Sequence, residues 1–356
     1  MKNLFTPLKI RNLELKNRIV LSPMQQYSSD DGFANDWHLV HYGSRAVGGA
    51  GLIITESAVV NPQGANTKND LGIWKDEHIE GLKRITDFIR KNGAKSAIQL
   101  AHFGSKGSKS HPNDGFQPIG IDKGGWQTVS SSEKVPFAGM SVPKKLSIDE
   151  IKSIQQDFVD AAIHSVAAGF DAIEVHAAHG YLFQQFYSQL INDRTDEYGG
   201  SFENRIRFLT ETIQRIRKVI PQEMPLLVRI SAVDYVEIDE NAWQIEDSIR
   251  LAKVLQPLGV DMITASGGGF VWVDKSNIME GYQVPFAEAI KNATGILTAS
   301  VGGIKSVNFA NEIIETEKAD LVVIAREHLR NPYFSIQAAK DLNETLPIPW
   351  QYKRAF

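Results

Sequence analysis

Eight short apolar runs alternate with longer stretches along the whole chain, and this alternation constrains the fold more than any other feature of the sequence. Each run is rich in Ile, Val and Leu and has few polar interruptions, which is typical of strands covered on both faces in a parallel sheet. The runs cover residues 18–24, 51–56, 96–102, 172–176, 225–231, 262–266, 296–301 and 321–325. They predict eight parallel strands.

Several of the intervening segments have the apolar spacing of amphipathic helices. Residues 147–168 begin with Ser147-Ile-Asp-Glu150, a Ser-x-x-Glu capping box, and end before Gly169. Similar spacing covers residues 77–91, 201–220 and 247–258. Eight strands that alternate with helices predict a closed (β/α)8 TIM barrel, and a doubly wound open sheet is the alternative. No linker-like segment divides the chain, so we expect a single domain over residues 1–356.

Two segments do not fit the alternation. Residues 103–145 are polar and rich in Gly and Pro, and they are too long for an ordinary connection, so we expect an excursion over the barrel mouth after the third strand. The extended tail after Pro347 contains three aromatic residues and would fray unless it docked on a surface, either its own barrel or a neighbouring subunit.

Composition excludes several function classes. The chain has no Cys, so disulfides, iron–sulfur clusters, thiolate zinc sites and cysteine nucleophiles are absent. A net charge of −4 and the lack of a Lys/Arg block disfavour nucleic-acid binding. No apolar run is long enough for a signal peptide or a membrane span. We therefore expect a cytoplasmic enzyme or binding protein.

Glycines and an arginine follow the last two predicted strands. In barrels of this kind the loops after strands seven and eight commonly hold a phosphate. Gly302 and Gly303 allow close backbone approach, and Arg326 offers a charge-assisted contact. A phosphate site is the functional interpretation, and an ordinary Gly turn with a surface arginine is the structural alternative.

The fourth strand ends in His176-Ala-Ala-His179-Gly-Tyr181. Two imidazoles and a phenol at a barrel mouth suit binding of a substrate oxygen and delivery of a proton. A structural pair bonded to carbonyls is a second interpretation. A metal site is a third, which the absence of a suitable third ligand nearby disfavours, and we expect no metal.

Arg229 lies within the fifth predicted strand, where an unpaired charge is costly. It could form an internal salt bridge with Glu56 or Glu174. It could instead place a fixed positive charge beside a ligand that becomes anionic. The chain has no Gly-x-Ser-x-Gly elbow, no P-loop and no Gly-x-Gly-x-x-Gly helix start, so serine hydrolases, triphosphate-binding enzymes and dinucleotide-binding folds are disfavoured.

Longer motifs resemble one family. In order along the chain these are Leu4-Phe-Thr-Pro-Leu, Leu15-Lys-Asn-Arg-Ile-Val, Ser22-Pro-Met, Asn61-Pro-Gln-Gly, Gln99-Leu-Ala-His, His176-Ala-Ala-His-Gly-Tyr181, Arg194-Thr-Asp-Glu-Tyr-Gly-Gly-Ser201, Glu203-Asn-Arg205 and Val228-Arg-Ile-Ser231. They resemble the old yellow enzyme family of FMN-dependent ene-reductases, especially its bacterial thermophilic-like subclass.

The resemblance implies an NAD(P)H oxidoreductase that reduces the C=C bond of α,β-unsaturated carbonyl or nitro compounds in a ping-pong scheme. NADPH or NADH would reduce noncovalently bound FMN, and hydride would pass from flavin N5 to the β-carbon. His176 and His179 would bind the substrate oxygen, and Tyr181 would protonate the α-carbon. The implied FMN-binding residues are Ser22, Pro23, Met24, Gln25, Ser57, Gln99, Arg229, Gly302, Gly303, Ala325 and Arg326. Tyr27 and Lys106 match substrate-side positions.

The tail also matches this subclass. Gln351-Tyr352-Lys-Arg354 is similar to an ending in which an arginine reaches the neighbouring subunit's active site. The resemblance therefore implies a homodimer or a dimer of dimers, with Tyr352 and Arg354 at the contact and Arg354 on the substrate side.

Three positions depart from the subclass pattern. Gln25 stands where a Cys that tunes the flavin is usual, which puts the flavin potential in question. Ala325 replaces a common Gly, and Ser57 replaces a common Ala; both are small, so we expect them to be tolerated.

Other functions remain as alternatives. The site could serve a flavin-binding barrel with a quinone or another xenobiotic as acceptor, a non-redox phosphate-binding barrel enzyme, or a flavin-binding protein without turnover. The related dienoyl-CoA reductase type is disfavoured because it carries an iron–sulfur domain, and this chain has no Cys.

Overall fold

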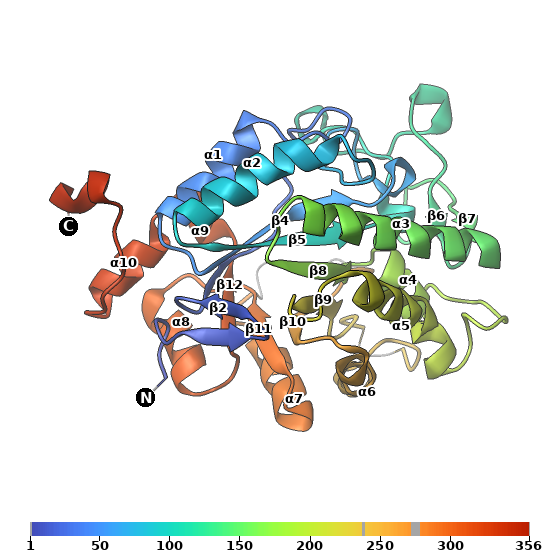
Figure 1. Cartoon of the computed structure of the whole chain (residues 1–356). Coiled ribbons are helices and arrows are strands. Elements are labelled where there is room, and N and C mark those ends of the chain that lie inside the picture. The colour runs from blue at the N-terminus through green and yellow to red at the C-terminus, as the bar shows by residue number, and fades with distance from the viewer. Residues whose placement is uncertain (1, 237–238, 272–277, 356) are drawn as a thin grey trace.

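The computed structural model describes residues 2–236, 239–271 and 278–355, and within them eight parallel strands close into a barrel (Figure 1). The strands are β3 (Ile19–Leu21), β4 (Leu52–Val59), β5 (Lys95–Ala101), β8 (Ala172–Ala177), β9 (Leu226–Ser231), β10 (Met262–Ser266), β11 (Leu297–Val301) and β12 (Leu321–Ile324). Closure comes from β12 pairing with β3, with Val322 opposite Ile19. All eight predicted strands and the predicted (β/α)8 class are confirmed, and the open-sheet alternative is wrong.

The barrel interior is a closed apolar core. Val20, Leu52 and Ile54 from the first strands pack with apolar side chains of the remaining strands. A short antiparallel hairpin, β1 (Leu8–Ile10) with β2 (Leu13–Leu15), contributes to the same core. Because β2 leads into β3, the hairpin covers the amino-terminal end of the barrel, and the opposite end is left for chemistry.

Helices cover the outside of the barrel. They are α1 (Asp36–Val47), α2 (His78–Lys91), α3 (Ile148–Ala167), α4 (Leu182–Tyr187), α5 (Phe202–Val219), α6 (Ile245–Leu255), α7 (Val284–Thr294), α8 (Val307–Glu315), α9 (Arg326–Arg330) and α10 (Phe334–Asp341). The capping box of α3 is present: the Ser147 hydroxyl accepts from the Glu150 N–H, and the Glu150 carboxylate accepts from the Ser147 N–H. The predicted helices correspond to α2, α3, α5 and α6.

The excursion after β5 consists of three 3-10 turns, η2 (Gly104–Lys106), η3 (Pro112–Asp114) and η4 (Ile121–Lys123), and a strand pair, β6 (Val129–Ser130) with β7 (Lys144–Lys145). The Phe116 ring packs edge-on against Tyr27, with ring centroids 5.6 Å apart. The His111 ring nitrogen lies 3.1 Å from the Tyr27 carbonyl oxygen. These contacts hold the excursion over the loop that follows β3, at the barrel mouth.

The C-terminal segment projects from the barrel on the side away from the excursion (Figure 1). Its last turn, η7 (Trp350–Ala355), is exposed, and Trp350 keeps 76% of its surface accessible. Tyr352 contacts Tyr333 through hydroxyls 3.4 Å apart. The tail therefore does not enter the mouth of its own barrel.

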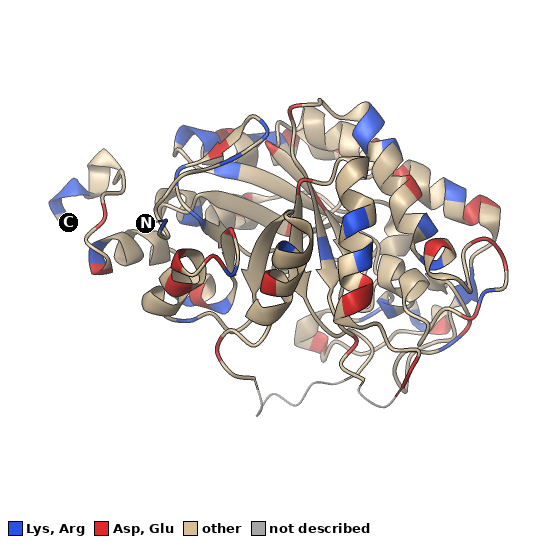
Figure 2. Ribbon diagram, turned by 90° about the horizontal axis from the view of Figure 1, so that it is seen from below, with Lys and Arg blue, Asp and Glu red and all other residues tan. Residues whose placement is uncertain are grey.

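Charged residues of both signs are interspersed along the outer helices (Figure 2). Among the described residues, no helix is both long enough and apolar enough to cross a membrane.

Candidate active site

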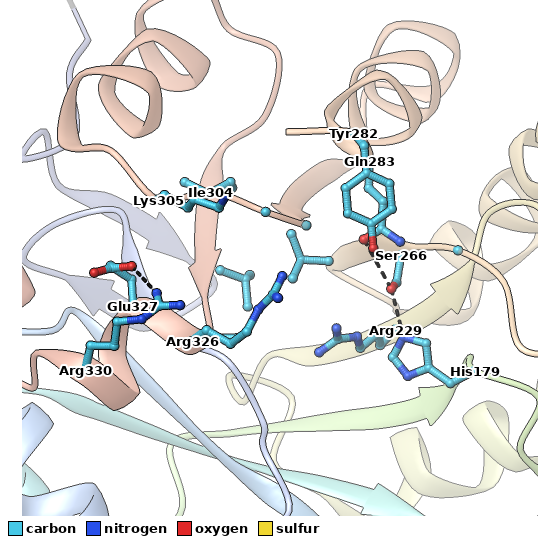
Figure 3. A pocket seen from close by; sticks show the side chains of 16 residues that line it. His179, Arg229, Ser266, Tyr282, Gln283, Ile304, Lys305, Arg326, Glu327 and Arg330 are labelled. Carbon is cyan, nitrogen blue, oxygen red and sulfur yellow. Dashed lines mark hydrogen bonds and ion pairs between the residues drawn. The ribbon is translucent and has the colours of Figure 1, made fainter. Parts of the chain in front are cut away.

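Two adjacent cavities open at the carboxyl ends of the strands. The first, of about 280 Å³, lies between the loops after β9 to β12 (Figure 3). The second, of about 580 Å³, lies between the excursion and the loop after β8. His179 and Gly267 line both cavities, so the two form one continuous candidate site.

The first cavity has the features of an anion site. Gly302 and Gly303 line it with φ angles of +113° and +68°, a backbone conformation that favours glycine. The Arg326 side chain points into the cavity (Figure 3) and forms no ion pair or hydrogen bond with the described residues. Glu327, its neighbour in sequence, pairs with Arg330 instead. A phosphate in this cavity could therefore contact the Arg326 guanidinium and the accessible backbone of Gly302 and Gly303.

Arg229 is a buried cation without a hydrogen-bonded partner among the described residues. Its guanidinium lines the first cavity, its Nε has no partner, and no carboxylate of the described residues lies within ion-pair distance. Burial lowers the pKa of Arg229, and the nearby charge of Glu174 opposes that shift. The salt bridge with Glu56 or Glu174, one of the two alternatives for Arg229, is not formed. The geometry favours the other interpretation, a positive charge waiting for a ligand.

A chain of hydrogen bonds crosses the barrel mouth beneath this cavity. The Ser57 hydroxyl donates to the Gln99 amide oxygen over 2.6 Å, and the Gln99 amide nitrogen donates to Glu174 over 2.7 Å. The second Glu174 oxygen accepts from the Thr264 hydroxyl over 2.7 Å. Burial raises the pKa of Glu174, and Arg229 lowers it. The network fixes Gln99, and sequence reasoning missed Glu174 as part of the site.

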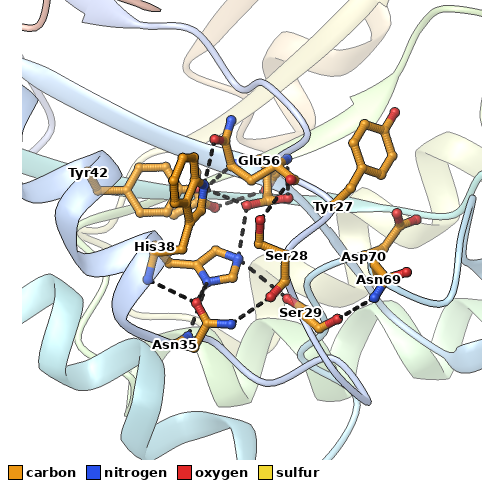
Figure 4. A network of polar contacts seen from close by, with 12 residues as sticks. Tyr27, Ser28, Ser29, Asn35, His38, Tyr42, Glu56, Asn69 and Asp70 are labelled. Atoms are coloured by element: carbon orange, nitrogen blue, oxygen red, sulfur yellow. Dashed lines mark hydrogen bonds and ion pairs between the residues drawn. The ribbon is translucent and has the colours of Figure 1, made fainter. Parts of the chain in front are cut away.

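Glu56 has a different role, which Figure 4 shows. One of its oxygens accepts from the Tyr42 hydroxyl over 3.0 Å and the other from the Gln26 N–H over 2.8 Å. His38 lies 3.3 Å away on the same carboxylate. Glu56 is therefore engaged in holding the loop after β3, which carries the predicted residues of the 22–27 segment.

Gln25 in that loop has an unpaired amide. Neither its nitrogen nor its oxygen is exposed, and neither has a hydrogen-bond partner among the described residues. An unsatisfied buried amide is destabilising by about 1–3 kcal/mol, so a ligand atom that bonded to it would relieve that cost. Ser22, the residue directly after β3, is fixed by a 3.0 Å hydrogen bond from its N–H to the Ile324 carbonyl.

The two histidines form a directed hydrogen-bond chain. The Ala178 N–H donates to His176 Nδ1, so neutral His176 carries its proton on Nε2. That nitrogen lies 3.2 Å from His179 Nδ1, and His179 Nε2 lies 2.8 Å from the Ser266 hydroxyl. Burial first, and the Arg229 charge second, lower the pKa of both rings. Both are therefore neutral N–H donors; His179 lies at the junction of the two cavities, and the buried His176 contacts it from behind.

Tyr181 stands beside these rings in the second cavity. Its ring centroid lies 4.8 Å from that of His176 and 4.4 Å from that of Phe103. Burial, with Asp70 as a smaller cause, raises the pKa of the phenol above its usual value. The hydroxyl therefore stays protonated at neutral pH and can act as a proton donor.

Lys106 connects the two walls of the second cavity. Its ammonium donates to the carbonyls of His179 and Gly269. Burial, and the charge of Lys109 in second place, lower the pKa of Lys106 to about 7.

The structure gathers most of the predicted residues at one mouth and leaves the tail outside it. Tyr352 and Arg354 are exposed in η7, at the end of the segment that projects from the barrel (Figure 1). Sequence reasoning also missed Ser266 and Gln283, which line the first cavity beside His179. Ser266 is the last residue of β10 and precedes three glycines, and this position at a strand end is the sequence signal that could have identified it as a site residue.

Comparisons relate the chain to known proteins over nearly its whole length. The NADH:flavin oxidoreductase / NADH oxidase family profile matches residues 3–345. An NADPH dehydrogenase of Bacillus subtilis (strain 168) is 45% identical over 357 residues, covering 100% of this chain and 99% of the relative. An NADPH dehydrogenase of Listeria innocua serovar 6a is 43% identical over 359 residues, covering 100% of both.

Two solved structures of related reductases are also similar to this chain in fold. Morphinone reductase in complex with tetrahydroNAD has a TM-score of 0.78 at 28% identity, over 98% of this chain and 93% of that one. A 2-naphthoyl-CoA reductase has a TM-score of 0.86 at 25% identity over 95% of this chain, but this chain spans only 52% of that longer protein.

Proposed function

Because the chain belongs to the NADH:flavin oxidoreductase / NADH oxidase family, the old yellow enzyme family, we propose that it reduces activated alkenes with electrons from NADPH or NADH. Membership makes it an FMN-dependent oxidoreductase. The acceptors in this proposal are α,β-unsaturated carbonyl or nitro compounds. The observation that carries it is the neutral His176/His179 pair beside a protonated Tyr181, with His179 lining both cavities and Tyr181 lining the second.

The residues present fit FMN. Gly302, Gly303 and Arg326 would hold the phosphate in the first cavity, together with the backbone at Ala325. Arg229 would lie against the electron-rich part of the ring, where reduction places negative charge, and this would satisfy its unpaired guanidinium.

The remaining cofactor contacts would come from the other side of the mouth. Gln99 would bond the ring edge, with Ser57 orienting its amide. The loop residues Ser22, Pro23, Met24 and Gln25 would line the ring, and the Gln25 amide would find a partner there. With FMN bound, the site supplies two hydride transfers in turn, from the nicotinamide to the flavin and from the flavin to the β-carbon of the acceptor.

The chain's own residues would then activate the alkene. A carbonyl or nitro oxygen would accept hydrogen bonds from the N–H groups of His176 and His179. Without substrate, the His176 N–H points to the His179 ring and the His179 N–H points to the Ser266 hydroxyl. These neutral donors polarise the conjugated double bond. Tyr181 would deliver a proton to the α-carbon. Lys106, which lines the second cavity, and Tyr27, whose ring packs against Phe116 of the same lining, would lie on the substrate side.

A second candidate electron acceptor is a quinone or another xenobiotic, whose oxygen the same two histidines, His176 and His179, would bind. A non-redox reaction on a phosphorylated substrate is disfavoured by the family and by the unpaired Gln25 and Arg229 beyond the phosphate cradle.

The proposal is tested by the visible spectrum of the purified protein under anaerobic conditions. We expect a flavin absorption band that bleaches on addition of NADPH and returns on addition of cyclohexenone. A band that bleaches but is restored only by a quinone would reassign the acceptor. Absence of protein-bound flavin, after incubation with FMN and removal of the unbound cofactor, would contradict the proposal as a whole.

We also propose that the whole chain, residues 1–356, acts as one FMN-binding domain whose tail completes a neighbouring copy's site. The exposed η7 turn, with Trp350 and Arg354 uncovered, supports a docking role.

Subunit complementation tests this tail exchange. Homodimers of R354M and of Y181F should each be impaired in alkene reduction, because each lacks a part of every site. Co-expressed mixed dimers should regain one working site, with Arg354 supplied by the Y181F subunit. The K353M variant is the control and should behave as wild type. Mixed dimers no more active than the average of the two homodimers would contradict the exchange.

A further inference from the structure

The second cavity has an asymmetric lining. Its wall on the excursion side is mainly apolar, with Phe116, Pro118, Phe137 and Met140. The charged side chains that line it are Lys106 and Lys109, and the described lining includes no carboxylate. A ligand in this space would therefore meet an apolar surface and positive charge.

The two lysines differ in what they already bind. The Lys106 ammonium donates to the carbonyls of His179 and Gly269 and so serves to join the cavity walls. The Lys109 ammonium lies 4.5 Å from the centroid of the Phe116 ring. Among the described residues it forms no ion pair and no hydrogen bond.

The acid whose charge acts on Lys109, Asp70, forms no ion pair with it. Asp70 exerts an electrostatic influence on it, but the Asp70 carboxylate is engaged by the N–H groups of Asn66 and Thr67 and by the Thr67 hydroxyl. Burial lowers the pKa of Lys109. The interaction of an anion with a half-buried cation that lacks a counter-ion is more favourable in free energy than its interaction with a fully hydrated cation.

The backbone that carries Lys109 is firmly held. Its N–H donates to the Asn66 carbonyl over 2.8 Å, and it forms an isolated bridge with Pro118. The neighbouring Ser108 hydroxyl donates to the Ile119 carbonyl over 2.7 Å. The direction of the Lys109 side chain is therefore set by a local fold of the excursion, as a specificity contact requires.

We propose that Lys109 binds an anionic group, such as a carboxylate, at the far end of an otherwise apolar acceptor, and so selects negatively charged alkenes. This inference rests on the proposed alkene reduction and names its substrate class. The apolar part of the acceptor would pack against Phe116, Phe137 and Met140, while its reacting end reaches His179 and Tyr181, which line the same cavity.

A matched pair of substrates tests the selectivity. Cinnamaldehyde with a para-carboxylate and cinnamaldehyde with a para-carboxamide have nearly the same shape and differ in charge. The wild-type enzyme should favour the carboxylate in kcat/KM, and K109M should lower the ratio of the two values about tenfold, as expected for loss of one charge-assisted contact at a half-exposed site. K109R should keep most of the preference, because it keeps the charge.

The control is K123M, which removes one charge from the same excursion at an exposed position outside the cavity lining. It should leave both kcat/KM values and their ratio unchanged. An equal fall of the ratio in K123M would indicate a long-range charge effect and would overturn the assignment to Lys109.

Two further readouts separate the possible failures. Calorimetric binding of the para-carboxylated saturated aldehyde should weaken about tenfold in K109M. If it is unchanged, the proposal is wrong. If K109M instead slows flavin reduction by NADPH and leaves the ratio of the two kcat/KM values unchanged, Lys109 binds the phosphates of NADPH and the proposal is wrong. If neither aldehyde reoxidises the reduced wild-type protein, the proposed function fails, and the calorimetric comparison still decides whether Lys109 binds a carboxylate.

Discussion

Replacing Arg229 with methionine is expected to weaken FMN binding by about ten- to a hundredfold and to leave the apoprotein folded. Arg229 is buried with an unpaired Nε and no ion pair among the described residues, so the fold gains little from its guanidinium. A charge-assisted contact to a bound ring is worth about 1.5–3 kcal/mol, and burial increases its value. Most of the loss should therefore appear in cofactor affinity.

Glu174 explains why the variant should still fold. Its oxygens keep their bonds to Gln99 and Thr264, and without Arg229 its pKa, already raised by burial, should rise further. The carboxyl group then becomes protonated at a higher pH, so the variant avoids an unpaired buried anion.

The measurement is titration of apoprotein with FMN by calorimetry, together with thermal unfolding with and without the cofactor. FMN should raise the melting temperature of R229M less than that of wild type, because stabilisation by a ligand depends on its concentration relative to Kd. R229K should bind more tightly than R229M. Near-wild-type FMN affinity in R229M would show that the charge serves another ligand.

Arg18 provides the control, because it is a buried arginine whose donors are satisfied. It donates to the carbonyls of Thr6, Pro7 and Asp320 next to the start of β3, at the opposite end of the barrel. R18M should destabilise the apoprotein and leave FMN affinity unchanged, which is the reverse of the result for R229M.

The sequence predicted the barrel because its strands are covered on both faces, which makes them continuous apolar runs independent of tertiary detail. The hairpin formed by β1 and β2 was missed because three-residue strands leave too short an alternation to recognise. Helix α1 was missed although Asn35 caps it. Exposed Trp37 and Val40 weaken its amphipathic pattern.

The candidate site was predictable for those residues whose position on a barrel strand decides whether the side chain points toward the mouth. Gln99 and Arg229 lie in barrel strands, so both reach the mouth region. The engagement of Glu56 with Tyr42, and the lack of an ion pair between Arg229 and any described residue, depend on contacts between distant segments. The place of Lys109 depends on the irregular excursion, whose path no periodicity encodes.

Replacing Tyr181 with phenylalanine is expected to slow reoxidation of the reduced flavin by an enone at least about a hundredfold, the usual contribution of a positioned general acid. Reduction of the flavin by NADPH should change by only a few fold, because that half-reaction needs no proton from the phenol. The ring contacts with Phe103 and His176 remain, so the fold should be retained. Stopped-flow absorbance measures the two half-reactions separately.

Two controls sharpen this result. Y198F removes a hydroxyl that donates to Glu211 in the outer shell, and it should leave both half-reactions unchanged. Equal slowing of both half-reactions in Y181F would exclude the proton-donor role and indicate a general disturbance of the cavity.

The pH dependence distinguishes the phenol from other donors. Burial raises the Tyr181 pKa above its ordinary value of about 10, so the phenol keeps its proton throughout the alkaline range tested. From pH 8 to pH 10, above the titration of Lys106 at about 7, the enone half-reaction should therefore stay flat. A donor with an ordinary phenol pKa would already lose half its protonated form by about pH 10. A twofold fall over this range would thus show that the proton comes from a more exposed group than Tyr181.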